Sequence, residues 1–361
     1  MKRRFLQLIP PAALIAAFYI LCRNTRVMDF AARRVGGAWR LLLGTITGYL
    51  PLSLYEVGGT ALALAIIALL VLAIIALLRR RNRAAAFGRI VALLVVAAYG
   101  FSAFLWFWCS AYFAPPVYYG ALDGRGVTVE ELERAAVILR DGANALAPAL
   151  PRDADGHLIL DLDEVIADSR DVFDGLTIEF PRLSGSRAKP KKMLYSEVMK
   201  RTGFTGVYFA LTGEANISKN SPPAMLPVTV AHELAHSRGV AAEDAANFFG
   251  VAACLTSGLP LFEYSGYLDG LIYTVNALGR VHETYNFTSG YSELVRRDLN
   301  DVRDYWARVD EQNANSPVVA AMAEVVNDTY DGYLRANNQE SGMATYGECV
   351  DLLVEWLCRK Y

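Results

Sequence analysis

Two histidines one helical turn apart carry the clearest chemical signal in this sequence. The stretch Val228-Thr-Val-Ala-His-Glu-Leu-Ala-His-Ser-Arg-Gly239 contains His232, Glu233 and His236 in the pattern His-Glu-x-x-His. On a helix, residues i and i+4 lie on the same face, so both imidazoles can bind one Zn²⁺. Glu233 is then placed to act as the general base on a metal-bound water. The chain has only four histidines, and this motif uses two of them.

A catalytic zinc site needs a third protein ligand and an open fourth position. Gly239 is expected to end the motif helix as a left-handed C-cap, and a new helix is expected over residues 241–257. Glu243 in its first turn is the predicted third ligand. Asp244, about 100° further around the helix, is the alternative, and both acids also suit the dipole of a helix start. Asn247, one turn after Glu243, is predicted to hydrogen-bond a ligand imidazole.

A short strand is predicted just before the motif. Residues Gly206 to Thr212 have the β-branched and aromatic content of a strand, and prolines at 222, 223 and 227 exclude helix until about Val228. An extended peptide substrate can add to the free edge of such a strand. Glu214 and Asn216, which follow it, are therefore candidate substrate-binding residues. A polar turn that caps the strand is the alternative interpretation of both.

Peptide hydrolysis also needs a hydrogen-bond donor for the developing oxyanion. His282 and Tyr264 are candidates for this role, and Tyr267 and Tyr346 are further ones. A surface histidine and half-buried tyrosines are the structural alternatives at these positions.

The motif and the helix after it resemble the gluzincin arrangement of zinc metallopeptidases. In membrane members of that group a Glu-x-x-Ala-Asp helix supplies the third ligand; here the segment reads Glu243-x-x-Ala-Asn247. Only six residues separate His236 from Glu243, whereas gluzincins usually place that Glu far downstream. The position of Gly239 after the motif resembles that of a glycine in the metzincins, but Ala242 occupies the place of their third His. The resemblance implies a zincin-like metallopeptidase domain with Zn²⁺ as its cofactor.

A closer resemblance covers most of the chain. It is to a family of bacterial membrane proteins catalogued as domain of unknown function 3810, whose name carries no substrate. The shared segments are Pro51-Leu-Ser53, Thr212 to Asn216, His232 to Gly239, Glu243 to Phe248, Val326 to Tyr330, and Asn337 to Tyr346.

Three apolar runs in the first third of the chain predict transmembrane helices, at about residues 5–22, 57–78 and 90–113. The first follows Lys2-Arg-Arg4 and has no small-x-small cleavage site, which favours an uncleaved helix over a signal peptide. The third ends in a cluster of aromatic residues that is typical of a membrane–water interface. Residues 1–115 are therefore predicted to form a membrane region, and residues 116–361 the catalytic domain.

The distribution of Lys and Arg predicts the orientation. With three spans, eight basic residues lie on the amino-terminal side of the membrane and five on the other. The positive-inside rule then puts the amino terminus in the cytoplasm and everything after Phe113 outside. The segment 29–52 alternates Arg with apolar residues, which predicts that it lies along the membrane surface.

The remaining two-thirds has the composition of a globular domain. A capping box at Thr128 to Glu131 predicts a helix towards Ala145. Further helices are expected at 162–173, 261–278 and 293–308, so the domain is predicted to be mainly α, of the α+β class, with a small sheet. The net charge of −2 gives no electrostatic footprint for nucleic acid. The five cysteines form no C-x-x-C pair and are predicted to be free, buried thiols.

The leading functional prediction is a zinc metallopeptidase anchored in the cell membrane, in contact with lipid, with an extracytoplasmic domain that cuts peptides or proteins near the membrane. An intramembrane protease is disfavoured, because residues 228–240 are too few to span and Arg238, Glu243 and Asp244 crowd them. The alternative from another class is a non-hydrolytic zinc-containing membrane sensor or cell-wall peptide-binding protein. Structural zinc sites usually close the fourth position with Cys or His, and only Cys254 is near in the sequence.

Overall fold

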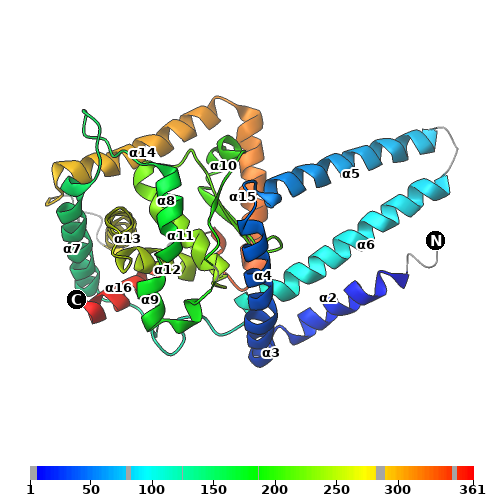
Figure 1. Cartoon of the computed structure of the whole chain (residues 1–361), viewed down its shortest axis with the longest axis horizontal. Coiled ribbons are helices and arrows are strands. Elements are labelled where there is room, and N and C mark those ends of the chain that lie inside the picture. The colour runs from blue at the N-terminus through cyan, green and yellow to red at the C-terminus, as the bar shows by residue number, and fades with distance from the viewer. Residues whose placement is uncertain (1–5, 79–82, 124, 186, 282–288, 344–347) are drawn as a thin grey trace.

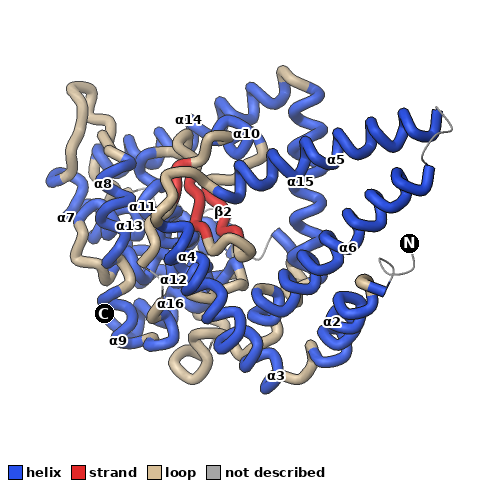
Figure 2. Tube along the Cα trace, turned by 45° about the vertical axis from the view of Figure 1, so that its right-hand side comes forward, coloured by secondary structure: helices blue, strands red, loops and turns tan. Residues whose placement is uncertain are grey.

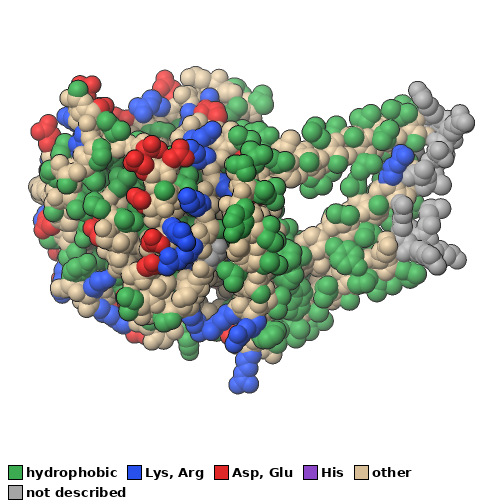
Figure 3. All heavy atoms as spheres, viewed as in Figure 1, with side chains coloured by type: hydrophobic (Ala, Val, Ile, Leu, Met, Phe, Trp, Pro, Cys, Tyr) green, Lys and Arg blue, Asp and Glu red, His purple; other side chains and the backbone are tan. Residues whose placement is uncertain are grey.

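Apolar helices project from one side of a mostly helical domain (Figure 1). The computed structural model describes residues 6–78, 83–123, 125–185, 187–281, 289–343 and 348–361. The projecting helices are α2 (Ile9–Leu21), α5 (Leu54–Leu78) and α6 (Arg83–Phe107). Their surfaces are almost entirely apolar, whereas charged side chains are spread over the domain (Figure 3).

Two of these helices are long and apolar enough to cross a membrane. The qualifying segments are Leu54–Ala76 and Ala86–Tyr112, and almost none of the first is buried inside the protein. The predicted count of three spans is corrected to two within the described part of the chain. α2 has 13 residues, so it is about 20 Å long at 1.5 Å per residue, against a hydrocarbon core of about 30 Å. It packs instead along α6, where Trp106 Nε1 donates to the carbonyl of Leu14 at 3.0 Å.

A nearly continuous helical segment fills the predicted surface-lying region. It comprises α3 (Thr25–Phe30), a π-helical stretch (Ala31–Gly36) and α4 (Gly37–Gly48). α4 lies across the base of the projecting helices (Figure 1). Trp39 Nε1 donates to the carbonyl of Ala210 at 3.2 Å, which fixes α4 to the domain. Leu41, Leu42 and Ile46 on the same helix are exposed.

The domain is built around α11, α12 and α13, with α7 and α16 packed against α13 and α12 (Figure 2). The capping box at Thr128 is confirmed, because its side chain accepts from the Glu131 N–H and Glu131 reaches back. The predicted helix 162–173 ends earlier, since a 3₁₀ turn at Ser169–Asp171 takes over. The domain helices are α7 (Val129–Leu146), α8 (Leu162–Asp168), α9 (Asp174–Glu179), α10 (Ser196–Arg201), α11 (Leu226–Ser237), α12 (Glu243–Leu255), α13 (Pro260–Val281), α14 (Glu293–Ala314), α15 (Pro317–Ala336) and α16 (Cys349–Lys360).

One small sheet stands beside α11. Its strands are β1 (Lys191–Lys192), β2 (Gly206–Phe209) and β3 (Glu214–Ile217), in the order β1-β3-β2. β2 and β3 form an antiparallel hairpin, while β1 joins β3 in parallel. The predicted strand to Thr212 ends at Phe209 because the chain turns there; Gly213 takes a φ of +70° at the end of the turn. β2 is an edge strand of this sheet.

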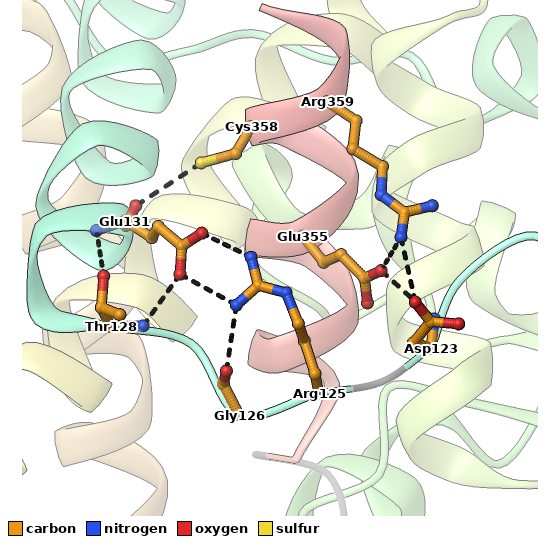
Figure 4. A network of polar contacts seen from close by, with 8 residues as sticks. All are labelled: Asp123, Arg125, Gly126, Thr128, Glu131, Glu355, Cys358 and Arg359. Carbon is orange, nitrogen blue, oxygen red and sulfur yellow. Dashed lines mark hydrogen bonds and ion pairs between the residues drawn. The ribbon is translucent and has the colours of Figure 1, made fainter.

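Polar contacts tie the carboxy-terminal helix to the start of α7 (Figure 4). Cys358 Sγ of α16 donates to the carbonyl of Glu131 at 3.9 Å. Arg359 pairs with Asp123 in the segment before α7, while Arg125 of that segment pairs with Glu131, the capping-box acid. α16 also buries Trp356 in the core, so this helix is an integral part of the domain. The five cysteines are free, as predicted, but the prediction that they are buried holds for Cys109, Cys254 and Cys349 and is wrong for Cys22 and Cys358, which are partly exposed.

Candidate metal centre

Two buried helices cross at the His-Glu-x-x-His motif. α11 begins at Leu226 with Pro227 in its first turn and ends where Gly239 adopts a φ of +95°. The predicted left-handed C-cap is therefore present. A Cβ at Gly250 of α12 would lie 3.1 Å from the backbone N of His232. The absence of a side chain at Gly250 thus allows α12 to come close enough for Glu243 to reach the histidines.

The predicted metal-binding residues lie together. Nε2 of His232 is 3.0 Å from Nε2 of His236, and Oε2 of Glu243 is 3.3 Å and 3.4 Å from these two nitrogens. Three ligands of a tetrahedral zinc ion with bonds of 2.0–2.1 Å would be about 3.3 Å apart. Oε2 of Glu243 is also buried without a hydrogen-bond partner among the described residues. The two nitrogens and this oxygen therefore fit Zn²⁺.

A backbone contact sets the tautomer of His236. Its Nδ1 lies 2.6 Å from the carbonyl of Val240, so Nδ1 carries the hydrogen and Nε2 keeps its lone pair for a metal. Burial alone would lower the pKa of His236, but the Glu243 carboxylate outweighs it and raises the pKa to about 9. Burial would likewise raise the pKa of Glu243, yet the two histidines hold it well below its usual value. Both shifts have the same cause, the attraction between the buried Glu243 carboxylate and the imidazoles beside it.

Glu233 is buried on the side of the motif helix that faces β2. Burial raises its pKa to about 7, a shift that His232 and His236 partly offset. A Cβ at Gly206 would lie 2.6 Å from Oε1 of Glu233, so a glycine is needed there for the carboxylate to keep this place. Like Glu243, it has one buried oxygen without a partner in the described part of the chain. Such a carboxylate can exchange a proton near neutral pH.

The cluster lies in a cavity of about 230 Å³ that is walled mainly by aromatic side chains. Tyr330 and Tyr333 of α15 are part of the wall, and the hydroxyl of Tyr330 donates to Oε1 of Glu243 at 2.5 Å. These tyrosines were not predicted, because they come about 90 residues after the motif and have no local spacing to connect them with it. The lining residues are Phe104, Trp108, Tyr112, Phe204, Gly206, Val207, Tyr208, Phe209, Ala210, His232, Glu233, His236, Glu243, Tyr330 and Tyr333.

The free edge of β2 runs along this cavity. Ser218 N donates to the carbonyl of Thr205 at 2.8 Å, so Thr205, just before β2, and Ser218, just after β3, form a hydrogen-bonded pair. Alternate residues of an antiparallel strand point to opposite sides. The N–H and C=O groups of Gly206 and Tyr208 therefore point away from β3, towards the free edge.

The predicted oxyanion donors do not gather here. Tyr264 donates to Asp298, which in turn pairs with Arg152 at 2.7 Å, in a buried contact between α13 and α14. Tyr267 packs beside Gly142 of α7. His282 and Tyr346 lie outside the described residues. Among the described cavity residues, Tyr330 has a hydroxyl that is hydrogen-bonded to a residue of the ligand set.

The two candidate substrate-binding residues stand in the sheet, not in the cavity wall. Glu214 accepts from the backbone N–H groups of Leu54 and Tyr55, both at 3.0 Å, and pairs with Lys191 at 2.7 Å. Asn216 donates to the carbonyls of Val207 and Glu214 itself. Their contacts connect the strands to each other and to the start of α5.

Asn247 and Asp244 of α12, also predicted near the ligand set, lie in different places. Asn247 is buried one turn after Glu243 on α12. Asp244 lines a different and larger cavity beside α3, and burial raises its pKa. The cluster of His232, His236 and Glu243 is completed without Asp244.

The fold and this site define a mostly helical protein with two membrane-length helices and a buried cluster of two histidines and a glutamate. A family model described as "Protein of unknown function (DUF3810)" matches residues 37–354, so the chain belongs to that family. The match includes α5, α6, the sheet and all three cluster residues. No curated protein and no solved structure matches the chain.

Proposed function

We propose that this chain is a membrane-anchored zinc metallopeptidase of zincin-like, gluzincin-like type. The observation that carries the proposal is the equal spacing of His232, His236 and Glu243, at 3.0–3.4 Å, beside a buried Glu233. Zn²⁺ held by these three residues would supply a Lewis acid that polarises a carbonyl and acidifies water.

Glu233 is the proton carrier in the proposed reaction. A carboxylate whose pKa is about 7 can take a proton from the attacking water and give it to the leaving amine. The hydroxyl of Tyr330 already approaches the ligand set through Glu243. It is therefore a group that orients the Glu243 carboxylate, whereas Tyr264 is held elsewhere by Asp298.

β2 is the proposed substrate-binding strand. The outward N–H and C=O groups of Gly206 and Tyr208 can pair with an extended peptide. Gly206 also contacts Glu233 closely, so a peptide paired at this point would pass the general base. A peptide or protein is therefore the proposed substrate.

The proposed location is the cell membrane, with the domain on its outer side. α5 and α6 supply the anchor; Arg79, Arg80 and Arg81 lie in the segment between them, and Arg83 is the first residue of α6. The positive-inside rule favours the cytoplasm for such a segment. Because α5 leaves the domain and α6 returns to it, the domain then faces outwards.

The test is Glu233→Gln in the purified full chain. We expect about one zinc per chain in both proteins and a loss of peptide hydrolysis of at least about 10²-fold in the variant, because the amide that replaces the carboxylate cannot accept a proton. Glu130→Gln, an exposed change of the same kind on α7, is the matched control. Undiminished hydrolysis by Glu233→Gln, or no zinc in the wild-type chain, would show that the proposal is wrong.

A further inference from the structure

The candidate metal centre lies between the inner ends of the two membrane-length helices. Phe104 and Trp108, at the end of α6 and just after it, line the cavity. On the opposite side, Phe209 of β2 also lines it, and the ring of Tyr55 on α5 lies 4.8 Å from the Phe209 ring. Figure 2, which turns the projecting helices forward, shows the strands between the start of α5 and the end of α6.

α5 and α6 separate as they approach the domain. They run close together at their far ends and diverge towards the sheet (Figure 1), and an open space is visible between them in the space-filling view (Figure 3). We refer to this space as the α5–α6 gap.

Two glycines lie one turn further out on α5 and α6 than the aromatic residues Tyr55 and Phe104. Gly59 follows Tyr55 by one turn, and Gly100 precedes Phe104 by one turn, so each shares a helix face with its aromatic neighbour. A Cβ added at either glycine would meet no atom within 4 Å. The α6 face that lines the cavity at Phe104, and the α5 face of Tyr55, which reaches the cavity through Phe209, are therefore open for at least one further turn towards the middle of the helices.

The occupant of the α5–α6 gap must be apolar and must also present backbone groups to β2. The gap lies between helices of membrane-spanning hydropathy, which suits lipid chains or an apolar helix. The free edge of β2, with Gly206 and Tyr208, suits an extended polypeptide, because only a backbone can continue the sheet. A polypeptide with a membrane helix followed by an extended segment satisfies both requirements.

We propose that the substrate is a membrane-embedded polypeptide that enters through the α5–α6 gap. Its membrane helix lies between α5 and α6, and the segment at the end of that helix pairs with β2 beside Glu233. This inference rests on the proposed peptidase function, and it adds the class of substrate and the route by which it arrives.

Photo-crosslinking tests the route without turnover. A benzophenone amino acid replaces Gly59 or Gly100 in a Glu233→Gln chain in lipid nanodiscs. The probe has a helix of about 20 Leu and Ala residues, followed by a peptide selected from a random library for cleavage by the wild-type chain. We expect crosslinks to the probe from positions 59 and 100. Val57, which lies about 200° around α5 from Tyr55 and is exposed, is the control position and is expected to crosslink lipid only.

Cleavage assays separate this inference from the proposed function. Gly59→Trp and Gly100→Trp should each lower cleavage of the anchored probe at least about tenfold, while the same peptide without its helix is cut at the wild-type rate. Val57→Trp should change neither. Crosslinks to lipid only, or tryptophan variants at 59 and 100 that still cut the anchored probe, would show that the route is wrong although the chain is a peptidase. If no library peptide is cut, the proposed function is wrong and the inference falls with it.

Discussion

Tyr330 supports the ligand set from outside the motif. Its hydroxyl donates to Oε1 of Glu243 at 2.5 Å, which leaves Oε2 turned towards the two histidines. Hydrogen bonds of this kind orient a ligand carboxylate, and their loss typically costs about 10- to 100-fold in metal affinity. We therefore expect Tyr330→Phe to weaken zinc binding by about 10–100-fold, as measured by competition with a fluorescent chelator.

Tyr333→Phe is the matched control for this change. Tyr333 lies one turn further along α15 and lines the same cavity, but its hydroxyl is hydrogen-bonded to Trp108 and Tyr112. The same loss of a phenolic hydroxyl should therefore leave zinc affinity close to wild type. Equal affinities for wild type and Tyr330→Phe would contradict a supporting role for Tyr330.

Local spacing explains which site residues could be predicted. His232, His236 and Glu243 lie within twelve residues on two successive helices, so helical periodicity and one glycine cap were enough to group them. Tyr330 is 87 residues from Glu243. Its place depends on how α15 packs, which no local pattern encodes. Tyr264 shows the converse: its type suited the predicted chemistry, but Asp298 binds its hydroxyl in another part of the domain.

At the scale of elements, Glu214 joins the sheet to the first membrane-length helix. Its two oxygens accept from the first N–H groups of α5, and Lys191 of β1 pairs with it while both are buried. Removing one partner of such a pair leaves an uncompensated charge and costs about 3–5 kcal/mol. We expect Glu214→Gln to lower the thermal unfolding midpoint in detergent. Adding Lys191→Met should restore part of it, because the unpaired charge is then gone.

The same variants test Glu214 as a substrate-binding residue. A role confined to the sheet and α5 leaves KM for a soluble peptide unchanged in the folded fraction, whereas contact with substrate would raise it. Lys192→Met is the control, since the neighbouring Lys192 is partly exposed and pairs with Asp163 at the surface, where such pairs contribute at most about 1 kcal/mol. An unfolding midpoint no lower for Glu214→Gln than for Lys192→Met would contradict the bracing role.

Elements with local signals were predicted, and elements made by distant pairing were not. The capping box at Thr128 and the glycine at 239 act within one turn, and both appear where expected. β1 has two residues and exists because Lys191 and Lys192 align with Asn216 and Ile217. In isolation that segment has the composition of a basic loop. A strand of this length carries no periodicity from which it could be recognised.

At the scale of the whole molecule, apolar composition overestimated the number of spans. Residues 5–22 are uncharged, but in the described part of this region the long helix runs from Ile9 to Leu21. Asn24 then caps the following helix through the N–H of Val27, so the chain changes direction before the helix can lengthen. An uncharged sequence is compatible with lipid, whereas the length of the regular helix decides whether the segment can cross the bilayer.

The contacts of α4 bear on which side of the membrane the parts of the chain lie. Trp39 bonds to Ala210, and Lys191 donates to the carbonyl of Thr47 at 2.7 Å. The segment before α5 and the domain after α6 must therefore share one side, and two spans would put the link between α5 and α6 on the other. Single cysteines can be placed in a chain whose own cysteines are replaced by alanine, and the variants expressed in cells. The side chain of Tyr49 is 85% exposed. In intact cells a membrane-impermeant maleimide should label Tyr49→Cys and Asp155→Cys, but not Asn82→Cys. All three should react after the cells are opened. Labelling of Asn82→Cys in intact cells together with Asp155→Cys would show that α5 and α6 do not cross the membrane, and the route through the α5–α6 gap would then be excluded as well.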